Sequence, residues 1–176
     1  MVDASTPIRH RIAADPIDPY LTYRLVHTTY VTWRKMGIYQ RNLSNFNERP
    51  LIENASTGYG CINCHAFSNN DPSRMLVHFR ILSPGTLIWR EGNLSKVDTR
   101  TPHTLSAGIY PAWHPDGNHI AFSTGKIIPH LTTRDNKVVD VADQASDLVV
   151  YDIENNTVTS STAISTPMRE NMPVWS

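Results

Sequence analysis

The chain has 176 residues, a formal net charge of zero and a sequence pI of about 7.1. Phosphate recognition requires clustered lysine and arginine, so this balance argues against a nucleic-acid partner. No apolar run approaches the roughly 18 to 20 residues that span a bilayer, so we predict no transmembrane segment. The first residues lack the apolar core of a signal peptide and leave the compartment open.

Taken in chain order, the sequence predicts an all-β fold. Runs rich in β-branched and aromatic residues recur at 20–26, 36–43, 74–82, 85–91, 119–124 and 147–153. Turn signals separate them, among them Ser83-Pro84-Gly85, Asp116-Gly117 and Glu154-Asn155-Asn156. We therefore expect short antiparallel strands joined by hairpins, with Tyr30–Met36 as the single helical prediction.

Both cysteines of the chain lie in Cys61-Ile62-Asn63-Cys64-His65. The pattern C-x-x-C-H is the attachment signature of c-type haem, in which two thiols add to the haem vinyl groups and the next histidine ligates iron. We therefore predict haem c as the cofactor, with Cys61 and Cys64 holding it covalently in a loop at about 53–73. His65 would be the proximal ligand, and its second ring nitrogen would donate to a backbone carbonyl or to water.

Three other interpretations of the cysteine pair remain open. A thioredoxin-like dithiol belongs in a βαβ context, which the β-rich surroundings disfavour. A zinc site needs four ligands, and His78 or His103 is the available fourth. A simple disulfide between Cys61 and Cys64 is the third. With a structural disulfide or a bound metal, the chain would be a non-catalytic protein-interaction scaffold.

Met75 and His78 are the candidates for the sixth iron ligand. If their run is a strand, Met75 shares one face with Val77 and Phe79, whereas His78 shares the other with Arg80. Methionine on such a face is more often a core residue than a ligand. Arg74 and Arg80 are available to pair with haem propionates, although arginines at such positions are more commonly ordinary surface residues.

The segment YPAWHPDGNHIAFST, Tyr110 to Thr124, resembles the repeats of TolB-type β-propellers, and MPVWS at the end of the chain repeats its Pro-x-Trp. Tyr20 to Met75 is also similar to the leading region of TolB-like, WD-like propeller proteins of Bacteroidetes that carry one C-x-x-C-H. These resemblances imply a partial β-propeller over 1–176, with about three four-stranded blades and the chain ending inside the next. The run 125–145 would be a loop, and the chain the N-terminal portion of a longer protein.

Haem attachment to such proteins is completed outside the cytoplasm, so this interpretation places the protein in the periplasm or at the outer membrane. Its function would be electron transfer or redox-linked binding, with a redox partner or another periplasmic protein. A sample made in a cytoplasm would carry no haem. We find no nucleophile elbow or phosphate-binding loop, which disfavours an enzyme but leaves a metal-dependent enzyme open. Turn polarity accounts for His114 and His119, and a solvated loop for Asp140 and Asp143.

Overall fold

The structure is a computed structural model that describes residues 11–12, 14–26, 36–80, 84–131 and 139–176. Its regular elements in these ranges are eleven β-strands and one short 3-10 helix, η2 (Asn54–Thr57). The helix predicted at Tyr30–Met36 lies outside the described residues, apart from Met36. No helix in the described ranges is long and apolar enough to cross a membrane.

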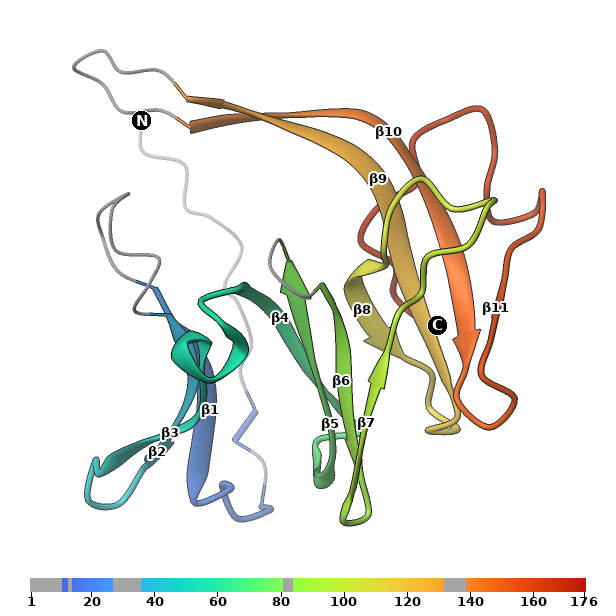
Figure 1. The fold of residues 1–176 in the computed structure, drawn as a ribbon. Coiled ribbons are helices and arrows are strands. Elements are labelled where there is room, and N and C mark those ends of the chain that lie inside the picture. Colours follow the sequence, from blue (N-terminus) through green and yellow to red (C-terminus); the bar gives the residue numbers. More distant parts are fainter. Residues whose placement is uncertain (1–10, 13, 27–35, 81–83, 132–138) are drawn as a thin grey trace, which may run out of the picture.

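The strands form three antiparallel sheets that lie side by side, and none of them closes on itself (Figure 1). Sheet A contains β1 (Tyr20–Leu25), β2 (Gly37–Asn42) and β3 (Glu48–Glu53). Sheet B contains β4 (Cys61–Ser68), β5 (Asp71–Arg80), β6 (Gly85–Arg90) and β7 (Asn93–Val97). Sheet C contains β8 (Ile109–Trp113), β9 (His119–Leu131), β10 (Val139–Asp152) and β11 (Thr157–Thr159).

This architecture confirms the all-β class and the presence of three antiparallel sheets. All six predicted runs fall on strands, namely β1, β2, β5, β6, β9 and β10. Sheet A has three strands where four were expected.

Sheet B lies between two hydrophobic cores, because successive side chains of a strand point to opposite faces. Leu76 of β5 packs with Trp113, Phe122 and other residues in the core shared with sheet C. Its neighbour Val77 packs with Ile38 of β2 in the core shared with sheet A. The two faces predicted for β5 are therefore present.

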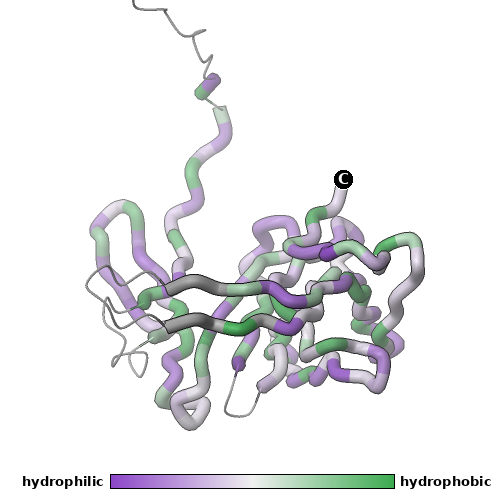
Figure 2. Tube along the Cα trace, turned by 90° about the horizontal axis from the view of Figure 1, so that it is seen from above, coloured by the Kyte–Doolittle hydropathy of each residue, from purple (hydrophilic) through white to green (hydrophobic). Residues whose placement is uncertain are grey.

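The run 125–145, expected as a loop, belongs largely to the two longest strands. β9 continues to Leu131 and β10 begins at Val139, and they pair in antiparallel register with one irregularity between Asp143 and Ala145. Figures 1 and 2 show this hairpin extending from sheet C across the neighbouring sheets. β-branched residues of β9, such as Ile127 and Ile128, favour extended backbone, which fits the continued strand pairing.

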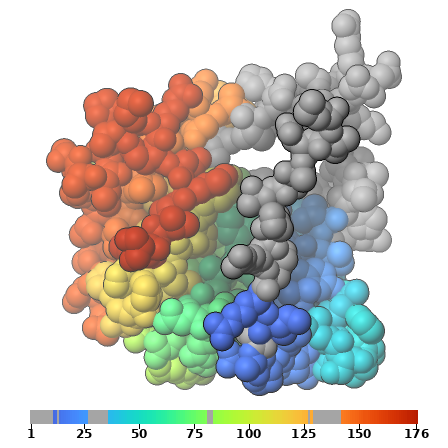
Figure 3. All heavy atoms as spheres, turned by 180° about the vertical axis from the view of Figure 1, so that it is seen from behind, coloured from blue at the N-terminus to red at the C-terminus, as the bar shows by residue number. Residues whose placement is uncertain are grey.

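The residues that follow β11 return across sheet C, as the rear view in Figure 3 shows. The backbone N–H of Met172 donates to Oγ of Ser123 over 2.8 Å. Trp175 Nε1 donates to the carbonyl of Ala112 over 2.9 Å. The C-terminal segment is thereby attached to β8 and β9.

Candidate functional site

The C-x-x-C-H residues begin β4, which contacts β8 of sheet C and both β1 and β2 of sheet A. The segment 53–73, expected as a loop, consists of η2, a short turn, β4 and the start of β5. Gly58 ends η2 in the left-handed conformation, with φ of 68°, which glycine adopts without strain. The chain is thereby redirected into β4 just before Cys61.

A β-bulge interrupts β4 within the motif. Ile62 pairs with Phe79 and His65 with Val77, so Asn63 and Cys64 together lie opposite the single residue between those partners. Such a bulge bends the strand and redirects its side chains. Arg24 of β1 holds it in place, since its Nη1 donates to the backbone oxygen of Asn63 over 2.7 Å and to its Oδ1 over 3.0 Å.

Both cysteines are free thiols and are partly buried. Burial raises the pKa of Cys61, and the positive charges of Arg80 and Arg24 oppose that rise. The Nδ2 atom of Asn63 donates to Sγ of Cys64 over 2.9 Å. The surroundings of the two sulfurs therefore differ. Burial affects the Cys61 thiol, whereas the Cys64 sulfur accepts a hydrogen bond from a side-chain amide.

His65 follows the bulge on the face of sheet B that points toward sheet A. Burial lowers the pKa of its imidazole, a backbone hydrogen bond with Thr22 opposes this, and the charge of Arg24 adds to it. Because that hydrogen bond favours the protonated ring, one imidazole N–H donates to the carbonyl of Thr22. Neutral imidazole with one nitrogen engaged in this way keeps a lone pair on the other, as metal-bound histidines require.

The two candidates for a sixth ligand lie on opposite faces of β5. Met75 pairs with Phe67 and packs against the core between sheets A and B. It lies on the same face of sheet B as His65. His78 is 1% exposed on the other face, where its Nδ1 lies 3.0 Å from Oγ1 of Thr86. The structure does not bring His78 to His65, and we do not carry His78 forward as a ligand.

Arg80 ends β5 opposite Cys61. Its guanidinium lies 5.8 Å from the ring centroid of Tyr110. Its Nε and Nη2 atoms are buried and have no hydrogen-bond partner in the described part of the chain. Arg80 therefore lies on the face of β5 that points toward sheet C, opposite the face that holds His65.

A second cluster was not predicted as a site. His114, Asp116 and His119 place one potential metal-binding atom each within 4.8 Å of one another, at the turn that joins β8 to β9. The sequence signal was present as two histidines flanking Pro-Asp-Gly. Turn polarity alone does not explain this convergence, which depends on the three-dimensional geometry of the turn and is not visible in the sequence.

Among known proteins, no family model matches the chain, no curated protein is significantly similar to it, and no solved structure matches it. The absence of a family match overturns the resemblance to TolB-like propeller proteins, which was wrong. Two cysteines three positions apart do not place the chain in a cytochrome family. The short Pro-Asp-Gly and Trp patterns suggested the resemblance. A tight turn next to a buried aromatic residue accounts for them, and this combination also occurs in unrelated β-hairpins.

Proposed function

We propose that this protein binds haem c covalently through Cys61 and Cys64, with His65 as an iron ligand, and that it transfers electrons outside the cytoplasm. The observation that carries the proposal is the order of the residues, with two thiols spaced as C-x-x-C and His65 directly behind them. Burial lowers the pKa of the His65 imidazole, and a backbone hydrogen bond with Thr22 opposes that lowering. Both thiols are free.

The covalent step needs no oxidant or further reactant. Each thiol adds across one vinyl group, so that sulfur bonds to one vinyl carbon and the proton is transferred to the other. When bound, the haem would supply one-electron chemistry at its iron.

The test is expression with an export signal alongside a c-type haem maturation system, followed by a pyridine haemochrome spectrum of the denatured chain. We expect covalent haem in the original chain and none in a Cys61→Ala/Cys64→Ala double variant. Either single variant should retain one vinyl group and shift the haemochrome band. His103→Ala, at an exposed residue outside the motif, is the matched control and should retain the full signal.

A chain that folds under these conditions without haem would overturn the proposal. Haem that survives denaturation in the double variant would also overturn it, because attachment would then involve other residues. A haem-free, folded chain would instead favour the protein-interaction scaffold with a structural disulfide or metal at the cysteines.

A further inference from the structure

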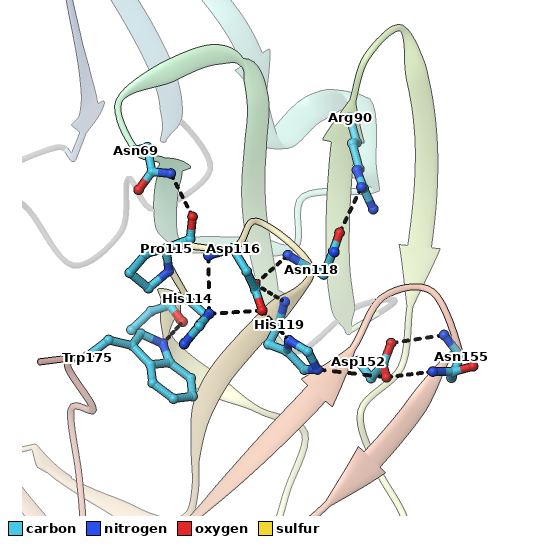
Figure 4. Close-up of polar contacts among 11 residues, drawn as sticks. Asn69, Arg90, His114, Pro115, Asp116, Asn118, His119, Asp152, Asn155 and Trp175 are labelled. Carbon is cyan, nitrogen blue, oxygen red and sulfur yellow. Dashed lines mark hydrogen bonds and ion pairs between the residues drawn. The ribbon is translucent and has the colours of Figure 1, made fainter.

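Two imidazoles and one carboxylate converge at the β8–β9 turn (Figure 4). Oδ2 of Asp116 lies 3.0 Å from Nδ1 of His114 and 2.7 Å from Nδ1 of His119. Ligand atoms about 2.0–2.2 Å from a tetrahedral metal are roughly 3.3 Å apart. The two contacts with Asp116 therefore need to lengthen by only a few tenths of an ångström to receive an ion, and the ligand atoms of all three residues lie within 4.8 Å of one another.

The turn itself aims the carboxylate at the histidines. Oδ1 of Asp116 accepts the backbone N–H groups of Asn118 over 2.8 Å and His119 over 3.1 Å. Oδ1 is thus occupied by the turn backbone, and Oδ2 is directed toward the histidines.

His114 lies against both the backbone and the side chain of Asp116. Its Nδ1 atom is 3.2 Å from the backbone nitrogen of Asp116 and 3.0 Å from Oδ2 of the carboxylate. When Nδ1 carries a proton it donates to Oδ2, and when it does not its lone pair is available to the backbone N–H or to a metal ion. The position of this nitrogen therefore suits a ligand.

The second nitrogen of His119 has an outer partner. Nε2 of His119 lies 3.8 Å from Oδ2 of Asp152, as Figure 4 shows. Asn155 fixes that carboxylate through its backbone N–H, over 3.0 Å, and its Nδ2, over 2.7 Å. A carboxylate behind the distal nitrogen is the usual support of a metal-bound histidine, because it orients the ring and increases its basicity.

Sheet B fixes the turn from outside. Nη2 of Arg90 donates to Oδ1 of Asn118 over 2.8 Å, and Nδ2 of Asn69 donates to the carbonyl of Pro115 over 2.9 Å. The ring of Trp175 meets that of His114 edge to face, with centroids 4.5 Å apart. The donor set is therefore held on a constrained hairpin with an apolar ring on one side.

From this geometry we propose that His114, Asp116 and His119 form a binding site for a divalent transition-metal ion, with Zn²⁺ as the probe ion. Two imidazole nitrogens and one carboxylate oxygen suit Zn²⁺, whereas Mg²⁺ and Ca²⁺ prefer oxygen ligands alone. A fourth position would be open to water or to another ligand. The site is separate from the cysteine motif and does not depend on haem.

The test is isothermal titration of chelator-treated protein with Zn²⁺ at neutral pH, using a chain without a polyhistidine tag. The Cys61→Ser/Cys64→Ser background removes the thiols as competing ligands. We expect one equivalent to bind, and His114→Ala and His119→Ala each to weaken binding by at least about tenfold, as losing even an outer partner does. Asp116→Asn retains the Oδ1 acceptor of the turn and should weaken binding while the fold persists.

His103→Ala, at an exposed histidine outside the cluster, is the matched control and should bind Zn²⁺ unchanged. Co²⁺ in place of Zn²⁺ should give visible bands of a four- or five-coordinate ion, lost in His119→Ala. Circular dichroism should show each variant folded. Absence of Zn²⁺ binding, or binding of equal affinity in the His114→Ala/His119→Ala double variant, would overturn the proposal.

Discussion

The Nδ1 atom of buried His78 lies 3.0 Å from Oγ1 of Thr86, the residue paired with it across β5 and β6. Burial, with a smaller contribution from the charge of Arg80, lowers the pKa of His78 from 6.5 to about 4. The imidazole is therefore neutral in the folded protein at physiological pH. His78 is therefore a buried structural residue that lies beside Thr86 within sheet B.

Because His78 is buried with a lowered pKa, we predict that the protein loses stability in acid. Between pH 6.5 and about 4, the unfolded chain binds a proton that folded His78 does not, so stability falls as the pH falls through this window. A shift of this size corresponds to about 3 kcal/mol by pH 4. Urea unfolding at pH 7 and pH 4 measures this loss. The free energy of unfolding should fall by about 3 kcal/mol less in His78→Gln than in the original chain. An equal decline in both proteins would contradict the burial of a neutral histidine.

Trp113 joins sheets B and C. Its ring packs in their shared core, it is 9% exposed, and its Nε1 donates to the carbonyl of Ala66 over 3.3 Å. Trp113→Ala should reduce the free energy of unfolding by about 3–5 kcal/mol, because it removes a large buried ring. Trp89, 41% exposed on β6, is the matched control, and Trp89→Ala should cost clearly less. Similar costs in the two variants would show that Trp113 is not a core residue.

Gly108 is required by its contact with Phe122. A Cβ at position 108 would lie 2.6 Å from Cγ of Phe122, whose side chain is fully buried. Gly108→Ala should therefore destabilise the protein by about 1–3 kcal/mol through overpacking. Gly92→Ala is the comparison, because its Cβ would meet nothing within 4 Å and only its φ of 86° opposes alanine. Chemical unfolding measures both, and an unchanged midpoint for Gly108→Ala would refute the close approach.

Cys61 should react slowly while the chain is folded and free of haem. Burial raises the pKa of its thiol, which lowers the thiolate fraction, and also limits access. In a Cys64→Ser variant, where Cys61 is the single thiol, alkylation by iodoacetamide at pH 8 should be several times slower in buffer than in urea. A rate in buffer equal to or above the rate in urea would exclude a protected thiol.

Features that depend on neighbouring residues could be predicted from the sequence. The two faces of β5 follow from the alternation of its side chains, and the turn after Trp113 follows from Pro115-Asp116-Gly117. The sequence did not predict that the cysteine motif lies on a strand, because Cys61–Ser68 mixes polar and apolar residues on both faces. The bulge there depends on pairing with β5, which is a long-range property.

The second site shows the same limit. His114 and His119 are five positions apart, with the four residues of the turn between them. Whether their rings converge on Asp116 depends on the backbone hydrogen bonds of that turn and on side-chain rotamers. The partner Asp152 comes from another strand, 3.8 Å away in space. A contact between residues of two different strands cannot be predicted from the periodicity of the sequence.

The intact mass of the exported, matured chain tests most directly whether Cys61 and Cys64 carry haem. We predict a chain heavier by one haem, with Cys61 and Cys64 both resistant to alkylation after denaturation. A denatured chain with the mass of the bare polypeptide and two reactive thiols would contradict it.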